Sequence, residues 1–355
     1  MKTTRPTIYR KATLGIDLGD RKHAVCALNA KGEIVAEMTI PNTRERLAML
    51  VKRFPKARIA MEVGSHSLWI SRLLDKLGCE VIVANSRKLR AIYQNERKSD
   101  ELDARMLAKL ARVDASLLHP IVHGSEQAQR DLLQIKLRDN LVRQRVDVIS
   151  AVRFTLKGLG IRLPSPKTTC FARRAQMLLQ GDEAEVLAMI EPSLQVIDTM
   201  TAKIRELDRE IERLCQERYP ESQRLREIRG IGPITALCFI LTIGDPQRFR
   251  HPRDGGAYLG LVPRRDQSGG VDKSLRISKC GNAYLRRLLV GSAQYLLGPF
   301  GEECDLQIRG LRLAQRGGRG AKKKAVVATA RKLAVVMMTI WKNDTAYEPM
   351  KLASA

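Results

Sequence analysis

An aspartate stands inside the first apolar run of this chain, and that run opens a series of five segments with the spacing of β-strands. Three of them, Thr13–Leu18, His23–Asn29 and Glu33–Ile40, are separated only by short polar turns, a pattern that predicts an antiparallel meander. Two further runs, Arg58–Val63 and Glu80–Ala84, flank a stretch of helical character and predict strands joined by a crossover helix. The sequence therefore predicts a mixed sheet with helices.

Four carboxylates stand out by position. Asp17 lies in an apolar strand, where a charge costs on the order of several kcal/mol unless a cation or another partner offsets it. Glu62 lies near the end of the fourth strand, and Asp100 and Asp103 are spaced to share one helical face. Helix capping that starts at Ser99 is the alternative explanation for that pair. Taken together, the four form a reasonable oxygen-ligand set for Mg²⁺.

The net charge of +25 favours a polyanionic partner, because such an excess repels itself unless nucleic acid or a similar polymer binds. The charge is uneven: residues 1–120 carry 23 basic and 13 acidic side chains, residues 121–222 carry 16 and 15, and residues 223–355 carry 24 and 10. We therefore expect three domains, over residues 12–120, 121–222 and 223–345.

The sequence also bears on the compartment. The seven cysteines are scattered and form no CxxC pair, which is typical of reduced core residues in a cytoplasmic protein. The chain has no uncharged apolar run of 18 residues and does not open with a signal peptide. We expect a cytoplasmic location and no membrane partner.

The middle segment has an apolar seam with alternating steps of three and four residues, which predicts a short coiled coil. The seam consists of Ile197, Met200, Ile204, Leu207, Ile211 and Leu214. It can pair with a second chain or pack on its own domain, and its densely charged flanks favour pairing between chains. A second long helix is expected over Asp131–Leu156, and Pro164 and Pro166 should break the region between the two helices.

The last segment contains two glycine-rich elements. Gly230 and Gly232 precede an apolar helix, as in a helix-hairpin-helix element whose backbone N–H groups approach a phosphate. A tight turn between core helices is the alternative. Ser268 follows Arg264 and Arg265 in a glycine-rich loop. A serine needs a base or a metal to act as a nucleophile, whereas arginines can hold a phosphate oxyanion, and by themselves these residues favour a flexible turn.

A basic run, Arg309–Lys324, leads into an expected helix over Ala325–Trp341. So many like charges in one run favour phosphate contact over a solvated loop.

Three motifs as an ordered set resemble the DEDD-type insertion-sequence transposases, which are related to Piv-type DNA invertases. They are Gly15-Ile16-Asp17, Met61-Glu62-Val63-Gly64 and the segment Lys98–Ala108. The segments Tyr258–Gly270 and Ile277–Arg287 are similar to the family's C-terminal signature, whose serine falls on Ser268. The resemblance covers about residues 12–342 and leaves the first eleven residues unplaced.

The resemblance implies an α/β plus α architecture: an N-terminal RNase-H-like (RuvC-like) domain, a helical coiled-coil middle, and a mainly helical C-terminal transposase domain with a helix-hairpin-helix. It implies Mg²⁺ held by Asp17, Glu62, Asp100 and Asp103, and a covalent link between DNA and Ser268. The implied partners are double-stranded donor and target DNA, a structured noncoding guide RNA encoded by the element, and further copies of the chain in a dimer or tetramer. Nucleic-acid contacts are expected from Gly230, Gly232, Arg264, Arg265, Lys279, Arg286, Arg287, Lys322, Lys323 and Lys324.

Two other functions fit the same residues. A metal-only resolvase would cut branched DNA with Ser268 as a structural residue, and a helix-hairpin-helix protein would bind DNA without cutting it. Full cleavage without Ser268 would favour the first, and neutral residues at the carboxylate positions would favour the second.

Overall fold

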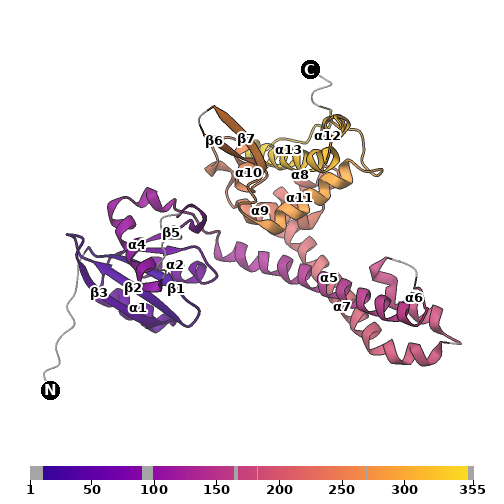
Figure 1. Ribbon diagram of the computed structural model, residues 1–355, viewed down its shortest axis with the longest axis horizontal. Helices are drawn as coiled ribbons and strands as arrows, with labels where there is room; N and C mark the ends of the chain where they lie inside the picture. Colours follow the sequence, from indigo (N-terminus) through magenta and orange to yellow (C-terminus); the bar gives the residue numbers. More distant parts are fainter. Residues whose placement is uncertain (1–10, 90–98, 164–166, 182, 269, 351–355) are drawn as a thin grey trace. The chain divides into compact units, whose positions relative to one another are not determined.

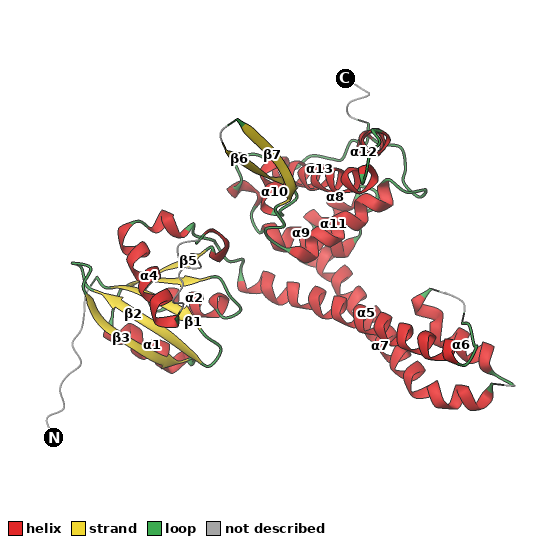
Figure 2. Cartoon of the chain, viewed as in Figure 1, coloured by secondary structure: helices red, strands yellow, loops and turns green. Residues whose placement is uncertain are grey.

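The computed structural model divides the chain into two compact units, Met1–His123 (unit 1) and Gly124–Ala355 (unit 2) (Figure 1). The residues that it describes are 11–89, 99–163, 167–181, 183–268 and 270–350. The predicted breakers Pro164 and Pro166 lie outside them. Unit 1 is mixed α/β, and unit 2 is mostly helical with one β-hairpin (Figure 2).

Unit 1 contains a five-stranded sheet in the order β3-β2-β1-β4-β5. Its strands are β1 (Thr13–Leu18), β2 (Lys22–Leu28), β3 (Ile34–Pro41), β4 (Arg58–Glu62) and β5 (Glu80–Ala84). The first three are antiparallel neighbours, whereas β4 runs parallel to both β1 and β5. The predicted meander and crossover are confirmed, and the order is consistent with an RNase-H-like fold.

Helices cover both faces of this sheet. Helices α1 (Arg44–Arg53) and α2 (Ser67–Lys76) pack on one face, where Leu14, Ile16 and Met61 are fully buried. Helix α4 (Asp100–Val113) packs on the other face against smaller residues of β2, β4 and β5. The two faces differ in side-chain size, so α4 lies closer to the strands.

Gly15 sets that close approach. A Cβ atom built on Gly15 would lie 2.0 Å from the carbonyl oxygen of Ala104 and 2.5 Å from the amide nitrogen of Ala108. Contacts under 3.0 Å are essentially never seen for real Cβ atoms. The backbone of α4 therefore rests directly on β1, and only glycine fits at this position.

A long antiparallel helix pair forms one part of unit 2. Helix α5 (Glu126–Gly158) pairs with α7 (Ala184–Glu217), and the short α6 (Phe171–Leu179) packs at their far end. The buried carboxylate of Asp131 accepts hydrogen bonds from Arg218 and Tyr219 at 2.8 and 2.6 Å. Burial alone would raise the pKa of Asp131, but these donors outweigh it and hold the pKa below its ordinary value.

The apolar seam of α7 is covered by this same pairing. Ile197, Ile204, Ile211 and Leu214 are at most 4% exposed, and α5 of the same chain lies against α7. The preference for pairing between chains is therefore wrong, because an apolar stripe buried within its own unit is not free for a second copy.

The remainder of unit 2 is a helical body around α9 (Pro233–Ile243), most of whose residues are buried. The other elements are α8 (Glu221–Arg226), α10 (Arg253–Tyr258), β6 (Pro263–Ser268), β7 (Val271–Ile277), α11 (Ala283–Leu296), α12 (Asp305–Gln315) and α13 (Ala321–Asn343). Ile135 of α5 and Ile211 of α7 belong to the same core as α9, so the predicted division near residue 222 stays a proposal.

Three local expectations need correction. Much of the basic run is helical, because α12 extends to Gln315 and α13 already begins at Ala321. Ser268 is the last residue of strand β6, not part of an irregular loop. Cys170 is exposed, although all seven cysteines are free thiols.

Within the described residues, none of the helices combines the length and the hydropathy that a bilayer crossing requires.

Candidate active site

Asp17 and Glu62 lie close to the ends of two neighbouring parallel strands: Asp17 is the last residue but one of β1, and Glu62 is the last residue of β4. The ladder between β1 and β4 pairs Ile16 with Met61, so the next step along both strands brings Asp17 beside Glu62. Alternation places both on the face opposite Ile16 and Met61, which is the face that α4 covers. Both residues are half-buried.

The direction of α4 is fixed by contacts along its length. Near its C-terminal end, the Ala111 carbonyl accepts a hydrogen bond at 3.2 Å from Arg58, which pairs with Thr13 at the start of β1. Ala108, one turn earlier, and Ala104, two turns earlier, lie over Gly15. Helix α4 therefore runs antiparallel to β1, and its first turn lies toward the strand end that carries Asp17.

Asp100 and Asp103 have the spacing of the buried stripe of α4, although Asp100 is exposed and Asp103 is half-buried. Its sheet-facing residues are Ala104, Leu107, Ala108 and Ala111, and the two aspartates precede Ala104 and Leu107 by one turn each. The Ser99 hydroxyl caps the helix by accepting from the amide of Leu102, so capping and a ligand role are compatible. Acidic groups in the first turn also complement the helix dipole.

The donor chemistry of this edge suits a hard divalent cation, because all four side chains offer carboxylate oxygens. Among the described residues, however, no group of three or more acidic, histidine or cysteine side chains already stands close enough to hold an ion. The four side chains would have to rotate toward one another to share one.

Sequence reasoning missed a histidine beside this edge. His66 lies in the loop that follows β4, and its Nε2 lies 3.1 Å from an Asp20 carboxylate oxygen in the β1–β2 turn. Trp69 donates to His66 Nδ1 at 3.3 Å, which places the ring proton on Nε2. This pair ties together the two loops that leave Asp17 and Glu62; a histidine four residues after Glu62 was the available signal.

An arginine on α4 braces the helix against the edge of the sheet. Arg105 forms a two-point contact with Glu37 of β3. Hydrogen bonds from Arg105 hold the pKa of the Glu37 carboxyl below its ordinary value. The pair limits rotation of α4 about its own axis.

The predicted nucleophile lies in unit 2, on a two-stranded hairpin. Ser268 pairs with Val271 at the end where β6 turns into β7. The exposed Arg265 lies 4.0 Å from Asp272.

The other predicted nucleic-acid residues differ in their surroundings. Arg286 hydrogen-bonds the carbonyls of Leu259 and Cys280 at 3.0 and 2.5 Å, so its guanidinium holds a loop of the protein. Arg264 and Lys279 are exposed, and Arg287 is an exposed residue that contacts Asp139. The turn with Gly230 and Gly232 joins α8 to α9 as expected; its role as a phosphate-binding hairpin stays a proposal.

Lys322, Lys323 and Lys324 lie in the first turn of α13. This turn holds no acidic residue, and its cap residue, Gly320, has no side chain to accept a hydrogen bond. Cations at the positive end of a helix dipole are unfavourable, so the three lysines repel both one another and the helix terminus.

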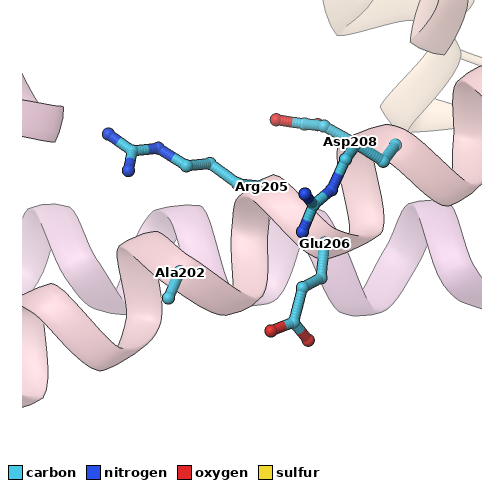
Figure 3. A pocket seen from close by; sticks show the side chains of 5 residues that line it. Ala202, Arg205, Glu206 and Asp208 are labelled. Carbon is cyan, nitrogen blue, oxygen red and sulfur yellow. The ribbon is translucent and has the colours of Figure 1, made fainter.

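A shallow hollow on α7 is lined by Ala202, Arg205, Glu206, Asp208 and Arg209. Figure 3 shows the side chains of Arg205 and Glu206 pointing away from each other, and Asp208 is bound to Arg138 at 2.8 Å. The hollow therefore brings no reactive groups together.

Comparison with protein families defines the class to which this arrangement belongs. Residues 14–161 match the DEDD transposase domain of the IS110 type, described as "Transposase", and residues 222–301 match "Transposase IS116/IS110/IS902 family". Both matched domains are domains of transposases. This chain belongs to the IS110/IS116 family of insertion-sequence transposases.

Curated relatives agree over nearly the full length. A "Probable family 20 transposase" of Pseudomonas aeruginosa is 28% identical and covers 95% of this chain and 98% of its own. The "Transposase for insertion sequence element IS1111A" of Coxiella burnetii is 25% identical over 98% of this chain and 96% of its own. The "Transposase for insertion sequence element IS1328" of Yersinia enterocolitica is 27% identical over 79% and 82%. The DEDD domain implies dependence on a divalent metal.

Proposed function

We propose that this chain cleaves and rejoins DNA strands as the transposase of an insertion sequence, with Mg²⁺ held by Asp17, Glu62, Asp100 and Asp103 and with Ser268 as the nucleophile. The observation that carries the proposal is the arrangement of unit 1. One carboxylate near the end of β1, one at the end of β4 and two in the first turn of α4 lie toward the same end of these two strands. Its family and relatives support the same activity.

The chemistry follows from the residues of the two units. Magnesium bound by the four carboxylates would supply charge neutralisation at the phosphate and would lower the pKa of an attacking oxygen. The Ser268 hydroxyl oxygen attacks phosphorus, an O–P bond forms, one bridging P–O bond breaks, the serine proton passes to a base, and the departing strand oxygen takes up a proton. A hydroxyl of the joining strand then displaces the serine, which preserves the phosphodiester without ATP. Arg264 and Arg265 would hold the phosphate oxyanion.

The proposed partners are double-stranded donor and target DNA, a noncoding guide RNA, and further copies of the chain. The excess of basic residues in segment 223–355 supports the nucleic-acid partners. The oligomer is proposed because the carboxylates and the serine lie in different units, so two chains can each supply half of a site. The buried seam of α7 gives this oligomer no support.

Two experiments test the proposal. Asp17→Asn and Asp103→Asn should each abolish Mg²⁺-dependent strand cleavage and weaken Mg²⁺ binding measured by calorimetry, whereas Asp75→Asn, an exposed control on α2, should do neither. Normal cleavage by either variant would remove the metal assignment.

The second experiment concerns the nucleophile. Labelled DNA should yield a protein–DNA adduct on a denaturing gel that is lost in Ser268→Ala and kept in Ser278→Ala. Complete cleavage by Ser268→Ala without an adduct would favour a metal-only nuclease instead.

A further inference from the structure

A groove of about 610 Å³ lies in unit 2 between the α8–α9 turn and one face of α11. Its walls and floor include Arg229, Gly230, Arg287, Gly291, Ser292 and Tyr295. All of these residues belong to unit 2, so the groove does not depend on how the two units are placed.

The floor of this groove is made of small residues and backbone. Gly291 faces open space, because a Cβ built there would meet nothing within 4 Å. Gly230 has a positive φ of 82°, and a Cβ on it would lie 3.0 Å from the ring of Tyr295. The α8–α9 turn therefore approaches the ring of Tyr295 as closely as a glycine allows. Because the floor of the groove has few side chains, a flat group can lie along it.

One aromatic ring, that of Tyr295, lines the groove, and the ring of Phe300 lies next to it. Tyr295 and Phe300 stack with their centroids 6.5 Å apart and their planes 21° apart. Tyr295 is 40% exposed and Phe300 is 74% exposed. Single exposed apolar residues are common, but a stacked pair of exposed rings beside an open groove is a surface on which a further planar group can stack.

The arginines near the groove are balanced by carboxylates. Arg229 contacts Glu302, and Arg287 contacts Asp139. Arg229 and Glu302 are 60% and 63% exposed, and exposed ion pairs of this kind contribute little, so a phosphate can take the place of the carboxylate. Local charge is neutral, however, and stacking must supply most of the affinity.

We propose that this groove binds an unpaired segment of a DNA strand, with a base stacked on Phe300 and phosphates near Arg229 and Arg287. Paired bases are covered on both faces by their neighbours, so the rings select an unstacked base. The nine residues from Arg287 to Tyr295 extend about 12 Å along α11, which spans about three to four nucleotides at the rise of a B-form strand.

The inference rests on the proposed function, because strand cleavage and exchange expose unpaired DNA. The test uses the full-length chain with Phe300→Trp, whose new tryptophan reports stacking by fluorescence quenching. Six-nucleotide single-stranded DNA, the same sequence as RNA, and a blunt duplex are titrated at several salt concentrations. Phe300→Ala is compared with Phe154→Ala, which removes a phenylalanine that is 79% exposed at the far end of the α5–α7 pair.

Single-stranded DNA should quench the fluorescence with a log–log salt slope of about one or less, and the duplex should not. Phe300→Ala should weaken binding of single-stranded DNA roughly tenfold, and Phe154→Ala should leave it unchanged. Equal quenching by the duplex, tighter binding of RNA, an unchanged affinity in Phe300→Ala, or burial of Phe300 between copies of the chain would each overturn the assignment.

Failure of this inference is distinguishable from failure of the proposed function. Strand cleavage and the Ser268 adduct can persist when no stacking is detected, and then only the groove assignment is wrong. Stacking without any cleavage would leave the groove intact and remove the transposase chemistry.

Discussion

Adding one methyl group at Gly15 should displace the helix that carries half of the carboxylates. The Cβ of Gly15→Ala would lie 2.0 Å from the Ala104 carbonyl oxygen, whereas ordinary contact begins near 3.4 Å. Helix α4 must therefore retreat from β1 by about 1.4 Å. The obstacle is backbone, so no change of side-chain rotamer relieves it.

The expected effects are different for stability and for activity. Overpacking of this kind costs about 1–3 kcal/mol, which lowers the melting temperature by roughly 5–15 °C. A displacement near 1 Å at a reacting centre costs on the order of 100-fold in rate. Strand cleavage should therefore fall much further than the loss of folded protein explains.

The assay compares cleavage rate and thermal unfolding of Gly15→Ala with those of Gly64→Ala. Gly64 belongs to the same unit, and a Cβ there meets nothing within 4 Å, so its variant should melt like wild type. If Gly15→Ala cleaves DNA at the wild-type rate and melts at the wild-type temperature, the close packing of α4 on β1 is refuted.

Three further perturbations have defined outcomes. Asp131→Asn should lower the free energy of unfolding by about 2–3 kcal/mol at pH 7. Because the pKa of Asp131 is depressed in the folded state, the difference in stability between wild type and variant should be complete above about pH 4. It should shrink as the pH falls through that folded pKa. Thermal unfolding against pH, with exposed Asp198→Asn as control, measures it. Replacing Lys322–Lys324 with Ala should reduce the log–log salt slope for duplex DNA by about 2–3 units; an unchanged slope would mean that the lysines are merely solvated. A mixture of Asp17→Asn and Ser268→Ala chains, each inactive alone, should recover strand transfer if the two halves of a site come from different chains, and mixed oligomers that stay inactive would exclude this.

The strands of unit 1 could be predicted nearly to the residue, because short polar turns separate apolar runs there. The observed β1 and β5 have the expected bounds, Thr13–Leu18 and Glu80–Ala84. The common edge of Asp17 and Glu62 follows from the same pattern, since parallel neighbours end together. The approach of α4 did not follow, because it depends on a missing side chain at Gly15.

In unit 2 the sequence patterns are compatible with more than one structure. The spacing of the α7 seam is the same whether its partner is a second chain or α5. The two cases differ only in whether the same chain folds back so that α5 and α7 pair, which the spacing does not show. The glycines that follow Ser268 in the sequence favour a loop, yet a Gly-Gly pair is also a hairpin turn signal. Three glycines of the basic run lie between Gln315 and Ala321, outside the two helices, whereas Gly310 lies within α12.

The start of α13 links binding to folding. Its first turn has three lysines and no capping side chain, while residues further along, including Leu333, Met337 and Ile340, form part of the core of unit 2. A phosphate held by the lysines would act as the missing cap and relieve their repulsion. Nucleic acid would then be a structural component of unit 2 as well as a substrate. Amide hydrogen exchange in α13 should slow when DNA is bound, from the first turn of the helix toward its buried residues.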